Sequence, residues 1–139
     1  DGSMTIENKR VEGITFSYTP AIRKIPAPKF GYIINKNNLQ ITLQKIGEKL
    51  NLNKKEIDDL IMSVQSITTG KYIYVSFFDH ETSHAILPIT FDPKPDVYRN
   101  IVFYFKNLDQ KPNFSIQPPT FDPIVRHGFT AIEISEIVE

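Results

Sequence analysis

The chain lacks cysteine altogether, and only six of its 139 residues are glycine. The absence of cysteine excludes a disulfide scaffold, a thiolate metal site and a cysteine nucleophile. The few glycines form no phosphate-binding loop, no dinucleotide fingerprint and no Gly-x-Ser-x-Gly motif. Several large classes of enzyme are therefore excluded from the sequence alone.

An excess of charge of one sign is also missing. Sixteen basic residues balance sixteen acidic ones, and the basic pairs Arg23-Lys24 and Lys54-Lys55 stand alone. Domains that bind nucleic acid usually carry a basic excess or a clustered basic face. No apolar run approaches the roughly 18 residues of a membrane-spanning helix. We expect neither nucleic-acid binding nor a membrane span.

The composition is that of a globular domain, with 40% hydrophobic and 23% charged residues. Gly2-Ser3-Met4 resembles a junction left by cloning, and the start lacks the basic and apolar regions of a signal peptide. We expect residues 1–12 to be a flexible start and residues 13–139 to form a single domain.

Residues 39–66 have the only helical pattern. Apolar residues recur there at helical spacing in two groups: Leu39, Leu43, Ile46 and Leu50, then Ile57, Leu60, Ile61 and Val64. Between the groups, Asn53 followed by Glu56 matches a capping box. The pattern predicts two amphipathic helices joined by a short turn.

Most of the remaining chain has the pattern of strands. Alternating, β-branched and aromatic residues predict strands at 13–18, 72–78, 85–91, 97–105 and 128–134, with a short apolar run at 32–34. Seven of the ten prolines lie between residues 88 and 123, where they mark turns. The expected fold is α+β: a two-helix pair packed on a four- or five-stranded, mainly antiparallel sheet.

The most conspicuous motif is His80-Glu81-Thr82-Ser83-His84, which matches H-E-x-x-H. In zinc peptidases a helix places both imidazoles on one metal, and the glutamate polarises the metal-bound water. Here a predicted strand precedes the motif, Pro88 follows closely, and Thr82 and Ser83 favour turns. We expect residues 79–83 to form the tip of a hairpin, without metal or other cofactor. A zinc-dependent hydrolase, with His80 and His84 as ligands and Glu81 as base, is the alternative.

Sixteen of the residues are phenylalanine or tyrosine, and they are concentrated in the strands. If Ile73, Val75 and Phe77 face the helices, the tyrosines lie on the opposite face of the sheet. An open face of tyrosines would suit contact with protein or carbohydrate, whereas a second layer covering it is an equally good interpretation. The candidate binding surface comprises Tyr72, Tyr74, Tyr98, Tyr104 and Arg126.

Near the C-terminus, Gly128 is expected to adopt a positive φ at the start of the last strand. Arg126 is expected to pair with Glu133 or Asp122, and a ligand-anchoring role is the alternative.

The second half of the chain resembles an uncharacterised family of bacterial proteins. The similarity lies in Leu87-Pro88-Ile89, Pro93-Lys94-Pro95-Asp96, Arg99 and Arg126-His127-Gly128-Phe129-Thr130-Ala131-Ile132-Glu133. The family pattern is P-x-P-D before an Arg-led strand, then R-x-G-F-T-x-x-E-W-G-G. This chain departs from it with Glu133-Ile134-Ser135-Glu136 at the end. The resemblance implies a bacterial domain, in the envelope or secreted rather than in the cytoplasm, and transfers no activity.

Together these observations predict a non-catalytic protein-interaction or structural module, part of a larger bacterial protein or assembly. Its expected partner is another protein. The zinc-dependent hydrolase and a carbohydrate-binding module that uses exposed tyrosines are the two alternatives.

Overall fold

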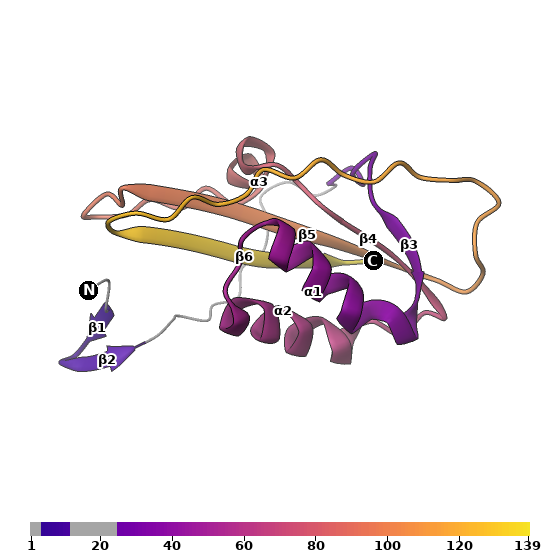
Figure 1. Ribbon diagram of the computed structural model, residues 1–139, viewed down its shortest axis with the longest axis horizontal. Helices are drawn as coiled ribbons and strands as arrows, with labels where there is room; N and C mark the ends of the chain where they lie inside the picture. Colours follow the sequence, from indigo (N-terminus) through magenta and orange to yellow (C-terminus); the bar gives the residue numbers. More distant parts are fainter. Residues whose placement is uncertain (1–3, 12–24) are drawn as a thin grey trace.

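A four-stranded mixed sheet with helices on both faces forms the body of the computed structural model, which describes residues 4–11 and 25–139 (Figure 1). The strands are β3 (Tyr32–Asn35), β4 (Tyr72–Phe77), β5 (Val97–Leu108) and β6 (Thr130–Val138), in the order β3-β4-β5-β6. The first two pairings are antiparallel and β5–β6 is parallel. The α+β class and the mostly antiparallel sheet are thus confirmed. The strand expected at residues 13–18 lies outside the described residues.

A separate hairpin precedes this sheet. Strand β1 (Met4–Ile6) pairs antiparallel with β2 (Lys9–Val11). The two residues between them, Glu7 and Asn8, have φ values of 49° and 63°. Two consecutive positive φ values are typical of the tight turn that best fits the twist of a hairpin. Residues 4–11, within the start expected to be flexible, thus form a hairpin in the structure.

Two helices cover one face of the sheet. A 3-10 turn, η1 (Lys36–Asn38), leads into α1 (Leu39–Lys49), and α2 (Lys54–Ile67) follows after a short turn. The predicted capping box is present, because Asn53 Oδ1 accepts from the Glu56 N–H at 2.9 Å and Glu56 Oε2 accepts from the Asn53 N–H at 2.8 Å. The apolar stripes of both helices join the sheet residues of this face in one core. The predicted helix pair is confirmed.

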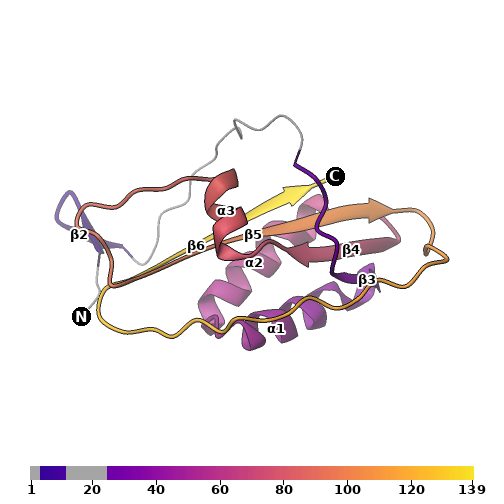
Figure 2. The same ribbon diagram turned by 90° about the horizontal axis from the view of Figure 1, so that it is seen from above.

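A third helix, α3 (His80–Ile86), packs on the opposite face (Figure 2). The hairpin tip expected at 79–83 and the strand expected at 85–91 are both wrong. Asp79 caps the helix by accepting from the Thr82 N–H at 2.7 Å. Ser83 and Ile86, three residues apart, are buried against the sheet. Burial of this inner face stabilises a helix that local preferences disfavour, and Pro88 lies just beyond its end.

The parallel pairing of β5 and β6 requires the chain to return across the domain, which residues 109–129 do without a helix. Figure 2 shows this segment running back beside α1. Ile124 anchors this segment to the domain. Its side chain is 1% exposed, and its N–H donates to the Leu50 carbonyl at 2.9 Å. The Asn51 amide donates to the Ile124 carbonyl at 2.6 Å. The helix-to-helix turn thus anchors the crossover.

Gly128 ends the crossover with φ +55°, as expected from the sequence. A Cβ at this position would lie 2.1 Å from Asp96 Oδ2. That oxygen accepts from the Phe129 N–H at 2.7 Å. Both the backbone conformation and the close carboxylate therefore require glycine where β6 begins.

The anchoring role of Ile124 predicts the effect of truncating it. We expect Ile124→Ala to lower the free energy of unfolding by about 2–4 kcal/mol, because it leaves a cavity in the core. Val125→Ala is the matched control: its side chain is 73% exposed, and we expect a change within about 0.5 kcal/mol. Urea unfolding followed by circular dichroism measures both. Equal losses in the two variants would contradict this role.

Candidate functional site

The H-E-x-x-H motif lies on α3, against the part of β5 that β4 does not reach. Strand β4 ends its pairing at Phe77, and the Phe78 N–H then donates to the Val102 carbonyl. Beyond that point side chains of α3 accept from β5: Ser83 Oγ from the Val102 N–H and His80 Nδ1 from the Asn100 N–H, both at 3.0 Å. The helix therefore supplies acceptors for two backbone N–H groups of β5 that β4 leaves unpaired.

This arrangement fixes the tautomer of His80. A backbone N–H donates to Nδ1, so the neutral ring carries its proton on Nε2. Imidazoles that bind a metal through Nε2 need the opposite arrangement, with the proton on Nδ1. The rings of His80 and His84 are 6.2 Å apart between centroids, and no group of three metal-ligating side chains exists among the described residues. The helix required by the zinc alternative is present, but the polarity of His80 disfavours ligation.

Polar atoms without hydrogen-bond partners collect beneath α3. Asn100 is fully buried and donates to the Leu87 carbonyl at 2.8 Å. Its Oδ1, the Tyr98 hydroxyl and His84 Nδ1 are buried and lack partners within the described part of the chain. The Tyr98 ring lies edge-on to His80 and His84, at 5.4 and 5.8 Å between centroids. Two imidazoles, a phenol and an amide thus form one cluster.

Burial shifts the pKa values of three titratable groups in and beside this cluster so that the neutral form is favoured: His80, Tyr98 and Glu133. Burial, together with the charges of Arg99 and His84, lowers the pKa of His80 below its usual 6.5. Burial raises the pKa of Glu133, which pairs in register with Asn100 from β6. The environment beneath α3 therefore disfavours charge of either sign.

The proposed tyrosine surface is covered. Tyr74 and Tyr104 are 7% and 1% exposed, while Tyr72 and Tyr98 are half-buried. The alternation of side chains along β4 predicts that Ile73, Val75 and Phe77 face the helices. This prediction is confirmed, since all three pack with the helices. A second layer covers Tyr74 and Tyr104, as the alternative interpretation expected. Helix α3 packs on this layer's core, and the segment before β3 accepts hydrogen bonds from the Tyr74 hydroxyl. Tyr74 and Tyr104 are therefore covered in this structure, whereas Tyr72 and Tyr98 keep part of their surface exposed.

Arg126 makes a structural ion pair. Its guanidinium donates to Glu56 Oε2 at 2.6 Å and joins the crossover to the start of α2. The expected pairing with Glu133 or Asp122 is wrong, because Asp122 contacts Arg99 at 2.7 Å. Folding places Arg126 beside the start of α2, and this position makes Glu56 its partner.

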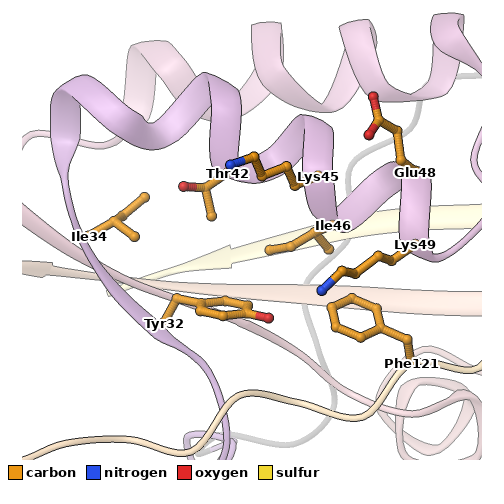
Figure 3. A pocket seen from close by; sticks show the side chains of 8 residues that line it. All are labelled: Tyr32, Ile34, Thr42, Lys45, Ile46, Glu48, Lys49 and Phe121. Carbon is orange, nitrogen blue, oxygen red and sulfur yellow. The ribbon is translucent and has the colours of Figure 1, made fainter.

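Two hollows were not apparent in the sequence. The smaller, of about 330 Å³, lies between β3, α1 and the crossover (Figure 3). The Lys49 ammonium sits 4.8 Å from the centroid of the Phe121 ring, and Figure 3 shows it also reaching toward Tyr32. Glu48 joins the lining, so acidic and basic groups are mixed. The cation and the aromatic ring of this lining thus already contact each other.

The larger hollow, of about 570 Å³, lies between the segment before β3 and the loop after β5. Phe30 and Phe114 line it and are 50% and 65% exposed. Lys29 and Lys106 join the lining, which includes no carboxylate. The loops that supply both phenylalanines show no regular pattern in the sequence, so only folding reveals the hollow.

Comparison of the chain with protein-family models, with curated proteins and with solved structures found no match. The resemblance to a bacterial family therefore stays a prediction. Among the helices of the described ranges, none has the length and apolar character needed to span a bilayer.

The lowered pKa of His80, caused first by its burial, predicts a pH dependence of stability. A histidine whose pKa is lower in the folded state binds protons more readily when unfolded, so the free energy of unfolding falls as pH drops below about 6.5. We expect His80→Asn, which keeps an acceptor near the Nδ1 position, to show a smaller fall than the parent between about pH 7.5 and pH 5. Denaturant unfolding at several pH values measures this, with exposed His127→Asn as the control. Parallel curves for all three proteins would contradict the assignment.

The tautomer of His80 also predicts the metal content. We expect less than about 0.1 equivalent of zinc in untagged protein purified without chelator, in the parent and in His80→Ala alike. Elemental analysis by mass spectrometry measures it. Near-stoichiometric zinc that disappears in His80→Ala would show that His80 Nε2 is a ligand and would revive the hydrolase alternative.

Proposed function

We propose that this domain is a non-catalytic protein-interaction module, part of a larger bacterial protein or assembly, which accepts an extended segment of its partner along β6. The observation that carries the proposal is that β6, nine residues long, is the last strand of its sheet. In the described part of the chain, no backbone bonds to its outer side. Strand addition to such an edge is a common mode of peptide recognition.

Hydrogen bonds at both ends of β6 identify the groups that point outward. The Phe129 carbonyl accepts from the Val97 N–H at 3.2 Å, and the Glu139 N–H donates to the Phe105 carbonyl at 2.9 Å. In a parallel pair, alternate residues direct both backbone groups to the same side. Odd-numbered residues therefore bond to β5, and the N–H and C=O groups of Ile132, Ile134 and Glu136 point away from the sheet.

The edge lacks the features that usually prevent pairing. Natural edge strands are commonly protected by proline, lysine, bulges or inward-pointing charges. Strand β6 contains no proline and no lysine. Its two glutamates are already engaged within the domain, Glu133 by the Ser135 hydroxyl at 2.7 Å and Glu136 by the Ser63 hydroxyl. A long, unprotected edge favours an interface.

An apolar side chain beside the edge would be covered by an added strand. Ile67 is 44% exposed and lies one helical turn beyond Ser63, the α2 residue that contacts β6. On the helix face of β6, Ile132 and Ile134 are only half-buried. A partner strand with apolar residues at alternate positions would extend this core.

The two alternative functions receive less support. A carbohydrate-binding module needs exposed tyrosines, and Tyr74 and Tyr104 are buried. A zinc-dependent hydrolase needs Nε2 of His80 as a ligand, and that atom carries the proton.

Amide hydrogen exchange tests the open edge. We expect the outward amides of Ile132, Ile134 and Glu136 to exchange at least about tenfold faster than the inward amides of Glu133 and Ser135, because only the latter are bonded within the sheet. NMR resolves them individually. Equal protection of both sets would mean that the edge is already paired and would overturn the proposal.

Peptide selection tests the function itself. We expect a displayed library of random 12-residue peptides to yield extended binders with alternating apolar residues, and binding to protect the outward amides of β6. Glu136→Pro removes one outward N–H and should weaken binding about tenfold or more, whereas Glu136→Ala, which keeps the N–H, should bind like the parent. Circular dichroism verifies that both variants fold. Binders insensitive to Glu136→Pro, or none at all, would overturn the proposal.

A further inference from the structure

The larger hollow carries an inference independent of the β6 edge. The segment before β3 crosses the strands on the sheet face opposite α1 and α2 (Figure 2), and its residues Pro28, Lys29 and Phe30 line the hollow. Its volume of about 570 Å³ falls within the range of small-molecule sites, roughly 300–1,000 Å³. The size therefore suits a small organic molecule.

The walls of the hollow are apolar. Phe30 and Phe114 come from loops far apart in sequence and leave half or more of their surface exposed. Ile33, Leu108 and Ile116 add aliphatic surface. Exposed apolar surface gathered around a hollow is typical of ligand-binding grooves and interaction sites. An apolar ligand body between the two rings would bury them.

The charged side chains of the lining are both cationic. Lys29 and Lys106 contribute ammonium groups, and no carboxylate lines the hollow. Lys29 makes no ion pair within the described residues, whereas Lys106 forms an ion pair with Glu139 at 3.5 Å. The same carboxylate oxygen of Glu139 accepts from the Tyr104 hydroxyl at 2.7 Å. The lining thus retains a positive charge that a ligand anion can complement.

We propose that this hollow binds an amphipathic carboxylate of the medium-chain fatty-acid type. The alkyl chain lies between Phe30 and Phe114, and the carboxylate faces Lys29 and Lys106. Apolar walls account for the body of the ligand and the two ammonium groups for its head. A sugar would fit this hollow poorly, because the lining has few uncharged polar side chains to form hydrogen bonds with its hydroxyl groups.

Two pairs of probes separate charge from apolarity. We expect 8-anilinonaphthalene-1-sulfonate to bind with enhanced fluorescence, and dodecanoate to displace it at concentrations about tenfold lower than 1-dodecanol. The neutral N-phenyl-1-naphthylamine should bind about tenfold more weakly than its sulfonate analogue. Equal affinity of the charged and neutral members of each pair would overturn the assignment of the lysines.

Variants locate the site. Phe114→Ser should weaken dodecanoate binding about tenfold or more, and Lys29→Gln with Lys106→Gln should weaken dodecanoate but not 1-dodecanol. Met62→Ser is the matched control, because Met62 is 68% exposed on α2, on the other side of the sheet. Equal loss in the control, or no loss in any variant, would show adventitious binding to exposed apolar surface and overturn the proposal.

Fatty-acid binding in the hollow and peptide binding at the β6 edge can be tested independently of each other. Glu136→Pro should leave dodecanoate binding unchanged, since β6 contributes nothing to the lining. Binding of selected peptides that dodecanoate blocks, and that protects the hollow rather than the outward amides of β6, would assign the hollow to a peptide and overturn the fatty-acid proposal.

Discussion

The buried backbone of β5 is the constraint on which the rest of the fold depends. This strand is twelve residues long, and its central side chains from Asn100 to Phe105 are all buried. Buried N–H and C=O groups must be paired, because water cannot reach them. Strand β6 pairs with one side of β5, and the six-residue β4 pairs with only half of the other. Helix α3 supplies the missing acceptors through His80 and Ser83.

This requirement gives the H-E-x-x-H sequence a structural role. His80 has to stay neutral to accept from the Asn100 N–H, and its surroundings lower its pKa. The same hydrogen bond places the proton on Nε2, where a metal would bind. This one hydrogen bond therefore both holds α3 on the sheet and disfavours zinc binding by the H-E-x-x-H motif.

The two faces and the last edge of the sheet differ in how completely they are covered. The helix pair α1–α2 covers most of one face with a continuous apolar core. The other face is covered piecewise, by α3 and by irregular segments, and an apolar hollow with a cationic lining lies between those segments. The crossover that forms β6 leaves this strand at the edge. The surfaces suited to partners thus arise where coverage is incomplete.

The sequence alone determined the two helices, the Asn53–Glu56 cap, the faces of β4 and the glycine at position 128. Each of these features depends on residue spacing or on the conformational range of a single residue. Long-range contacts decided the rest. Helix α3 forms against the preferences of Thr82 and Ser83 because its inner face is buried and bonded to β5. The partner of Arg126, the cover over the tyrosines and both hollows depend on segments distant in the chain, whose meeting no local pattern encodes.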